Sequence, residues 1–220
     1  MFGYTFYWSM VWDKLPELVE GARTTLTLTV LSMIIGTLVA LALTLLRRQG
    51  KGPGYTLATT WVEVARNTPA LFQVYMIYFG LGALGLHFSS YLAMLLALSF
   101  NNAGYLAEIF RGGLQAIPKQ QHTAARSLGL SSFAAYTHVV FPQLFRVVYF
   151  PYVNQLNWAL LNSSLGMIIG LRELTGATQA AQSESFRTFE FFLVAAAMYY
   201  VMSKLIEGGA RFTFWRVFKG

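Results

Sequence analysis

Long apolar stretches separated by short polar segments are the dominant pattern of this chain. The clearest covers residues 24–46, which carry no charged side chain. A helix needs about 20 predominantly apolar residues to cross the hydrocarbon of a bilayer. Four later stretches reach a similar length, at residues 59–80, 88–109, 147–171 and 188–212. The pattern predicts an all-α membrane protein with five transmembrane helices in a single domain over residues 1–220.

Two acid–base pairs interrupt the second and third stretches. Glu63 and Arg66 are spaced i, i+3, and so are Glu108 and Arg111, so each pair shares a helix face. Charges inside a bilayer are costly and face protein or water. The pairs are either local salt bridges that lower the insertion cost or a cytoplasmic-side gate whose ion pairs rearrange. Pro69 either kinks the second helix or begins its deeper part.

The first 22 residues differ from the stretches that follow. Trp8, Trp12 and Leu15 recur at helical spacing, and Asp13 lies among them. Tryptophan and tyrosine favour the headgroup level of a membrane. We expect residues 1–22 to form an interfacial N-terminal helix.

Residues 119–142, KQQHTAARSLGLSSFAAYTHVVFP, form a polar segment between two apolar stretches. Its alanines and leucines recur at helical spacing, and Gly129 is a helix-ending signal. Ser131 and Ser132 can cap a following helix, and Pro142 closes the segment. We expect two short helices joined by a turn and held at a membrane surface. A solvated interhelical loop is the simpler alternative.

The composition argues against a soluble domain and a nucleic-acid binder. Hydrophobic residues make up 55% of the 220 residues and charged residues only 11%, whereas soluble domains carry about 25% charged residues. The 16 Lys and Arg exceed the 9 Asp and Glu, but they stand at the ends of apolar stretches instead of clustering on one face. The chain has no cysteine, so cysteine usage says nothing about its redox compartment.

The basic residues set the expected topology. If the loop after residue 46 is cytoplasmic, most Lys and Arg lie inside, as the positive-inside rule requires. The N-terminus and residues 80–90 and 172–187 then face outside, while residues 112–146 and the C-terminus are cytoplasmic. The cytoplasmic set is Arg47, Arg48, Lys51, Arg111, Lys119, Arg126, Arg146, Arg211, Arg216 and Lys219, and the outer set is Lys14, Arg23, Arg172 and Arg187.

Polar side chains gather near the expected midplane of the third and fourth helices. The fourth helix is expected to end near Leu161, before a segment broken by Gly166 and Gly170. A single amide or hydroxyl there holds helices together, whereas several beside a broken helix indicate a solute site. The residues are Asn102 and the candidate substrate-binding residues Asn101, Tyr105, Asn162, Ser163 and Ser164.

Several segments together resemble one protein family. They are VEVARNTPALFQVYMIYFG, SFNNAGYLAEIFRGGLQAIPKQQHTAARSLG and LLNSSLGMIIGLRELTGA, with the polar segment between them. They are similar to the polar-amino-acid permeases of ABC importers, of the histidine, glutamine and glutamate type. In that family the polar segment is the EAA loop, which docks on a cytoplasmic ATPase and corresponds here to residues 118–135. The matching coupling positions are Thr123, Ala124, Ala125, Arg126, Gly129 and Pro142.

The resemblance also implies partners and a place in the cell. It implies the type I ABC importer arrangement in a bacterial inner membrane, with a second permease subunit in a homodimer or heterodimer. An ATPase dimer would bind ATP and Mg and hydrolyse the ATP, and an extracytoplasmic solute-binding protein would deliver a polar L-amino acid. Acidic amino acids are among the implied substrates. No nucleic-acid partner, and no cofactor in this chain, is implied.

Three positions depart from the family pattern. Thr123 replaces the leading Glu of the loop, so one contact with the ATPase is altered or lost. Leu161 and Asn162 stand where many members have Lys and Asp, which removes both charges from the candidate site. Asn67 follows Arg66 where Gly is commoner, a variation associated with acidic-amino-acid permeases. These departures leave open the substrate, and whether this subunit carries a substrate site at all.

Other function classes find less support in the sequence. The phosphate-binding pattern G-x-x-x-x-G-K-[ST] does not occur, and His87, His122 and His138 lack metal-ligand spacing. The alternative to the permease is a small ion-coupled transporter or channel that uses the intramembrane carboxylates, although no internal repeat is evident. A membrane-embedded enzyme ranks third, because there is no catalytic cluster.

Overall fold

The computed structural model describes residues 4–218, and within them every regular element is a helix. Residues 1–3 of the expected interfacial helix and the expected cytoplasmic Lys219 lie outside the described residues. The helices are α1 (Trp8–Arg47), α2 (Pro53–Asn67), α3 (Ala70–Tyr75), the π-helical turn η1 (Met76–Gly80), α4 (Leu81–Ala83), α5 (Ser90–Ala116), α6 (Lys119–Ser127), α7 (Ser132–Ala135), the π-helical turn η2 (Tyr136–Val140), α8 (Phe141–Asn162), the 3-10 helix η3 (Ser163–Ile169), α9 (Leu174–Ser185) and α10 (Thr188–Phe218).

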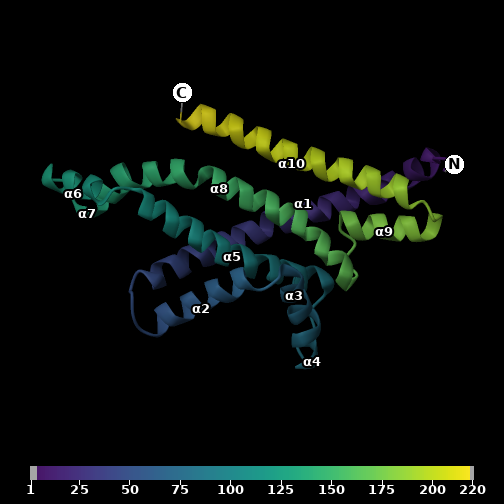
Figure 1. Cartoon of the computed structure of the whole chain (residues 1–220), viewed down its shortest axis with the longest axis horizontal. Coiled ribbons are helices and arrows are strands. Elements are labelled where there is room, and N and C mark those ends of the chain that lie inside the picture. Colours follow the sequence, from purple (N-terminus) through teal and green to yellow (C-terminus); the bar gives the residue numbers. More distant parts are fainter. Residues whose placement is uncertain (1–3, 219–220) are drawn as a thin grey trace.

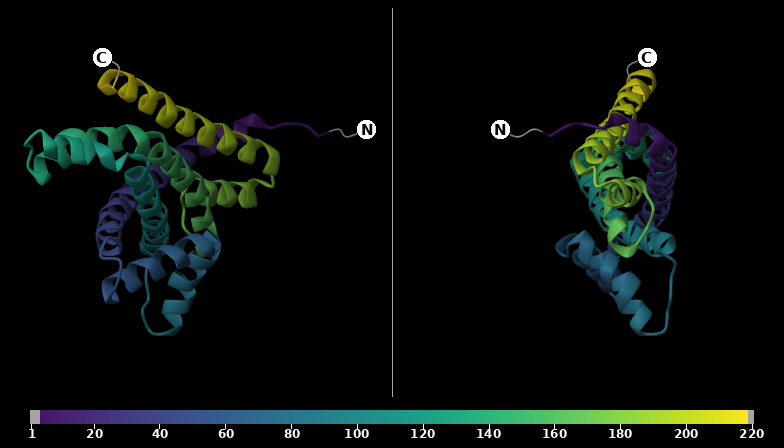
Figure 2. Two further views of the ribbon diagram at one scale, coloured as in Figure 1. Left: turned by 60° about the vertical axis from the view of Figure 1, so that its left-hand side comes forward. Right: turned by 90° about the vertical axis from the view of Figure 1, so that its right-hand side faces the viewer.

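The helices form an elongated bundle (Figure 1). α1 runs along the long axis and packs extensively against α5, while α10 lies next to α8 and α9. The α6–α7 turn lies at one end of the long axis, and α9 lies with the start of α1 at the other. Figure 2 shows α2, α3 and α4, in blue, together on one side of the bundle.

A single helix, α1, replaces the separate interfacial helix expected over residues 1–22. It begins at Trp8, includes Pro16 and continues without a break into the first apolar stretch. A Cβ atom on Gly21 would lie 3.0 Å from the Glu173 carbonyl oxygen. The first part of α1 therefore packs on α9, a neighbour that hydropathy alone does not reveal.

Three helices, α1, α5 and α10, are long and apolar enough to cross a membrane by length and composition. The other two expected spans are less regular. The second is divided between α2 and α3, and the fourth combines α8 with η3. The count of five spans therefore stays a prediction.

The second span breaks at Pro69, as the sequence predicts. Proline has no N–H to donate to the carbonyl of residue i−4, which here is Ala65. α2 ends at Asn67, and α3 begins after Pro69 as its N-cap. Gln73 of α3 reaches back across the break, and its Nε2 donates to the Ala65 carbonyl at 3.0 Å. A side chain thus replaces the missing backbone donor.

The fourth span also breaks where the sequence predicts. α8 ends at Asn162 and continues as η3, after which Gly170 has a φ of +75°. Pro142, which closes the polar segment in the sequence, does not interrupt the helix, because the chain stays helical from α7 through η2 into α8. The π-helical turn interrupts the regular hydrogen-bond ladder just before Pro142, so the missing N–H is tolerated there.

Small residues bring α5 close to its neighbours. A Cβ atom on Gly36 of α1 would lie 2.8 Å from the Asn102 Cβ, and one on Gly104 would lie 2.5 Å from the Ala65 Cβ. In a membrane, close backbone approach is a main source of helix association, because lipid offers no hydrophobic drive between helices. α5 is therefore held between α1 and α2 with its polar side chains inside the bundle.

Candidate functional site

Asn101 of α5 lies against the break in the second span. Its Nδ2 donates to the Ala65 carbonyl at 3.2 Å and to Gln73 Oε1 at 2.9 Å. The residue is only 2% exposed, and its buried Oδ1 has no hydrogen-bond partner among residues 4–218. Direct contact between Asn101 and a solute is not available in this conformation, because the side chain is buried and serves the carbonyl that Pro69 leaves without a donor.

Asn102, next along α5, joins three helices. Its Nδ2 donates to Ser32 Oγ of α1 at 3.3 Å, and its Oδ1 accepts from Gln155 Nε2 of α8 at 2.9 Å. All three side chains are buried. This network is an interhelical contact, the simpler of the two interpretations of midplane amides.

Tyr105 lies at the partly exposed edge of the same helix. Its ring packs on Trp158 of α8 with centroids 5.7 Å apart, and the Arg66 guanidinium lies 5.8 Å from its centroid. Tyr105 therefore connects the candidate site to the charged residues of α2.

Asn162, Ser163 and Ser164 hydrogen bond to the end of their own helix. Asn162 donates to the Trp158 carbonyl at 2.9 Å, and the two serines donate to Leu160 and Leu161 carbonyls at 2.8 and 2.7 Å. Ser163 is buried, whereas Asn162 and Ser164 are partly exposed. Among residues 4–218, no hydrogen bond joins this group to Asn101.

Ser164 lines a cavity of about 560 Å³ between the end of α8 and α10. The cavity presents hydroxyl groups and apolar surface, and no charged side chain lines it. Its lining residues are Leu161, Ser164, Thr175, Phe192, Ala195, Ala196, Tyr199, Tyr200 and Ser203. Of the candidate substrate residues, only Ser164 lines this cavity.

A buried carboxylate, Glu173, contacts two residues of the cavity wall, Thr175 and Tyr199. It caps α9 by accepting from the Gly176 N–H at 2.8 Å and the Thr175 N–H at 3.0 Å. Tyr199 of α10 donates to it at 2.8 Å, and Thr25 of α1 at 3.3 Å. Burial raises the pKa of the Glu173 carboxyl, and these hydrogen bonds oppose the rise. The carboxylate therefore ties α1, α9 and α10 together behind the cavity wall.

Three arginines converge on Glu108 of α5. Arg111 lies 2.6 Å from the carboxylate, Arg66 lies 3.6 Å from it, and Arg47 of α1 also forms an ion pair with it. Glu63, expected to pair with Arg66, is exposed and accepts from Asn67. The local pairing of Glu63 with Arg66 is therefore replaced by a cluster that joins α1, α2 and α5.

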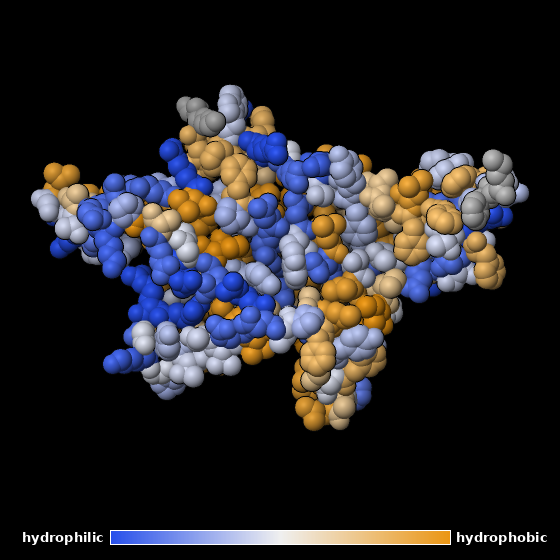
Figure 3. Space-filling view, in the orientation of Figure 1, coloured by the Kyte–Doolittle hydropathy of each residue, from blue (hydrophilic) through white to orange (hydrophobic). Residues whose placement is uncertain are grey.

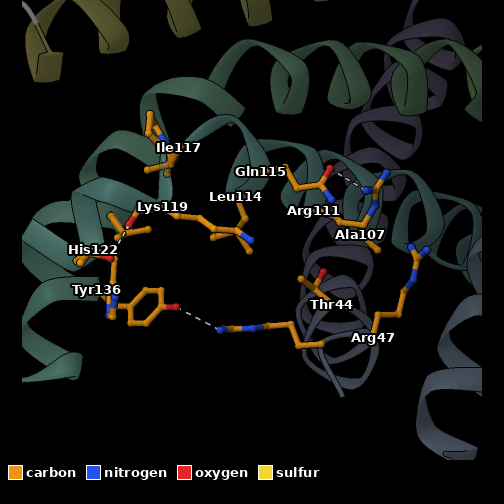
Figure 4. A pocket seen from close by; sticks show the side chains of 14 residues that line it. Thr44, Arg47, Ala107, Arg111, Leu114, Gln115, Ile117, Lys119, His122 and Tyr136 are labelled. Atoms are coloured by element: carbon orange, nitrogen blue, oxygen red, sulfur yellow. Dashed lines mark hydrogen bonds between the residues drawn. The ribbon is translucent and has the colours of Figure 1, made fainter. Parts of the chain in front are cut away.

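A basic cavity of about 680 Å³ lies between the ends of α1 and α5 and the helix α6 (Figure 4). Arg47, Arg111, Lys119 and His122 lie around it in the figure. Arg48 also lines it and donates to the Tyr136 hydroxyl at 3.3 Å. No Asp or Glu is among the lining residues.

The expected helix–turn–helix is confirmed at the end of the bundle. α6 is followed by Gly129, which has a φ of +86°, and Ser131 caps α7 by accepting from the Ala134 N–H at 3.1 Å. Arg126 donates to the Leu130 carbonyl at 2.7 Å and closes the turn. Two apolar side chains project beside the turn. Leu128 is 84% exposed and Phe133 is 78% exposed.

The other coupling candidates are distributed over α6. Ala125 is buried, whereas Thr123, Ala124 and Arg126 are exposed, and Thr123 also lines the basic cavity. α6 thus has one face toward the bundle and one face toward solvent. Figure 3 shows hydrophilic surface over much of this end of the molecule.

Sequence reasoning missed several residues that the structure brings into these sites. Gln73 and Gln155 hold the amide networks, Arg47 completes the Glu108 cluster, and Glu173 caps α9. A glutamine four residues after a helix-breaking proline was a usable signal for Gln73. For the others no local pattern exists, since their partners lie on distant helices.

The fold and these sites define a multi-pass helical membrane protein with a helix–turn–helix at one end. Residues 32–213 match the family described as binding-protein-dependent transport system inner membrane component. The chain belongs to this family, and the resemblance found in its sequence is thereby confirmed.

Named relatives and a solved structure agree with this assignment. The chain is 33% identical to the nopaline transport system permease protein NocM of Agrobacterium fabrum, with 90% of this chain and 88% of the relative covered. It is 32% identical to the glutamine transport system permease protein GlnP of Escherichia coli K12, with 92% and 93% covered. It is also similar to a chain of the crystal structure of an amino acid ABC transporter with histidines, at a TM-score of 0.90, 32% identity and coverage of 97% and 100%.

Proposed function

We propose that this chain is one permease subunit of an ATP-driven importer that carries a polar L-amino acid across a bacterial inner membrane. The observation that carries the proposal is the exposed turn at Gly129, placed at one end of a membrane-type bundle. Its exposed Leu128 and Phe133 offer apolar contacts to a partner. The proposal places the N-terminus outside and the C-terminus in the cytoplasm, with five spans between them.

The partners follow from the same arrangement. A cytoplasmic ATPase dimer binds ATP and Mg and contacts residues 118–135, through Ala124, Arg126 and the side chains beside Gly129. A second permease subunit, identical or different, completes the pathway. A solute-binding protein delivers the substrate to the opposite end of the bundle. The Glu108 cluster with Arg66 and Arg111 forms the cytoplasmic-side gate, and Glu63 lies beside it as an exposed acceptor.

We infer that the solute occupies the cavity beside Ser164. Its hydroxyl lining favours a polar side chain without net charge, and one relative is named for glutamine transport. Asn162 and Tyr105 border the pathway from α8 and α5, whereas the buried Asn101 and Ser163 position their helices. An acidic solute is the second candidate, since the exposed Arg66 lies over Tyr105 and supplies a countercharge.

The test is solute uptake by the complete complex in liposomes, with its ATPase and binding protein. Ser164→Ala removes one hydroxyl, and a lost hydrogen bond is worth about 0.5–1.5 kcal/mol, so the half-saturation for the preferred amino acid should rise roughly twofold to twelvefold. Thr213→Ala is the matched control, because this hydroxyl of α10 also donates to its own helix, at the Gly209 carbonyl, and does not line the cavity. Glutamine, arginine and glutamate are compared as solutes.

Each outcome bears on a separate part of the proposal. Uptake that needs no ATP would favour an ion-coupled carrier and contradict the importer. ATP-dependent uptake with equal half-saturation for Ser164→Ala and Thr213→Ala would leave the importer standing and remove this cavity as the solute site. Preference for glutamate would select the acidic alternative.

A further inference from the structure

The basic cavity beside α6 has a charge pattern that the proposed solute site does not explain. Arg47, Arg48, Arg111 and Lys119 line it, and no carboxylate does. Glu108 compensates Arg47 and Arg111 from behind the wall. The cavity thus concentrates positive charge in one concave surface.

Two of these cations, Arg48 and Lys119, form no salt bridge within the described part of the chain. Arg48 instead donates to the Tyr136 hydroxyl, and its guanidinium lies 5.6 Å from the centre of that ring. Cations gathered in a cleft repel one another and raise the local concentration of anions. The basic cavity therefore favours a bound anion.

The position of the cavity suggests which anion. Arg47 ends α1, the longest apolar helix, so the cavity lies where that helix leaves the hydrocarbon. Leu114, Ile117 and Val140 supply an apolar part of the lining. An arginine guanidinium matches the oxygen geometry of phosphate. Basic pockets between membrane helices on the cytoplasmic side suit anionic lipid headgroups.

We propose that this cavity binds the phosphate group of an anionic phospholipid, between the membrane end of the bundle and α6. Arg48 and Lys119 contact the phosphate, while the apolar side chains receive the first part of the acyl chains. A volume of about 680 Å³ is far larger than a bare phosphate needs. The bound lipid joins α1 to α6 and reinforces the base of the helix–turn–helix. The proposal does not depend on the identity of the transported solute.

The experiment uses the complete complex, stripped of lipid in a neutral detergent. Binding of dioctanoyl phosphatidylglycerol is measured by native mass spectrometry and compared with dioctanoyl phosphatidylcholine and with inorganic phosphate. Each basic residue near an anionic lipid surface contributes about fivefold in affinity. Arg48→Ala with Lys119→Ala should therefore weaken phosphatidylglycerol binding about twenty-five-fold. Arg211→Ala with Arg216→Ala is the matched control, since both arginines are exposed on α10 and do not line the cavity.

Arg48→Ala alone should weaken phosphatidylglycerol binding about fivefold. Because this variant leaves α6 unchanged, it separates loss of lipid binding from a general effect on assembly. The proposal is overturned if the cavity variant and the α10 control bind phosphatidylglycerol equally, or if phosphatidylcholine binds as tightly. If inorganic phosphate binds in an Arg48-dependent way and phosphatidylglycerol does not, the lipid is overturned as the source and free phosphate takes its place. Selective loss of phosphatidylglycerol in the cavity variants supports the lipid.

Discussion

Replacement of Glu108 by Gln tests whether one carboxylate holds three helices together. Glu108→Gln preserves the shape of the side chain and removes its charge. Arg47, Arg66 and Arg111 then converge on a neutral group, and their mutual repulsion is no longer offset. We expect the ends of α1, α2 and α5 that meet at Glu108 to separate more easily.

The exposed fractions of the Glu108 side chain and its three arginine partners determine how much stability Glu108→Gln should remove. The side chains of Glu108 and Arg47 are 15% and 19% exposed, whereas Arg66 and Arg111 are 42% and 43% exposed. Breaking a buried pair costs about 3–5 kcal/mol, and an exposed pair contributes about 0–1 kcal/mol. Since the Gln amide keeps an acceptor oxygen, we expect the free energy of unfolding to fall by about 3 kcal/mol, the low end of the range for a buried pair. At about 2–4 °C per kcal/mol, the Tm should fall by roughly 6–12 °C.

The assay is thermal unfolding of the purified complex in detergent, followed by gel-filtration fluorescence. Glu63→Gln is the matched control, because this exposed glutamate of α2 has Asn67 as its partner, and its Tm should change by less than about 2 °C. Adding Arg47→Gln to Glu108→Gln removes one uncompensated cation, so the pair should show a coupling energy of about 0.5–3 kcal/mol. Equal Tm values for Glu108→Gln and Glu63→Gln would refute the reasoning.

Three further predictions concern the turn, the packing and the topology. Gly129→Val places a β-branched residue at a φ of +86°, so solute-stimulated ATP hydrolysis should be lost while membrane insertion persists; normal coupled uptake would exclude the turn from energy transfer. Gly104→Ala puts a methyl group 2.5 Å from a side chain of α2 and should cost about 1–3 kcal/mol. Gly112→Ala serves as the thermal-unfolding control, because its methyl group meets no atom of residues 4–218 within 4 Å beyond its chain neighbours and the adjacent backbone of its own helix. In intact cells, an impermeant thiol reagent should label Leu84→Cys and spare Leu130→Cys, and the reverse result would invert the proposed topology.

The sequence by itself determined the features that depend on neighbouring residues. Apolar stretches marked membrane helices because the bilayer demands length and hydropathy, which are local properties. Pro69 marked the break between α2 and α3, and Gly129 marked the turn after α6, because backbone limits belong to the residue itself. The family signatures also lie in contiguous segments.

Only the tertiary structure decided which side chains meet. Arg66 pairs with Glu108 across helices instead of with Glu63, because α5 presents a less exposed carboxylate to α2. Asn101 serves the Ala65 carbonyl, a partner that exists only where α5 packs against the broken span. α1 extends to Trp8 because α9 packs beside it. These contacts join residues far apart in the chain, so neither residue spacing nor hydropathy predicts them.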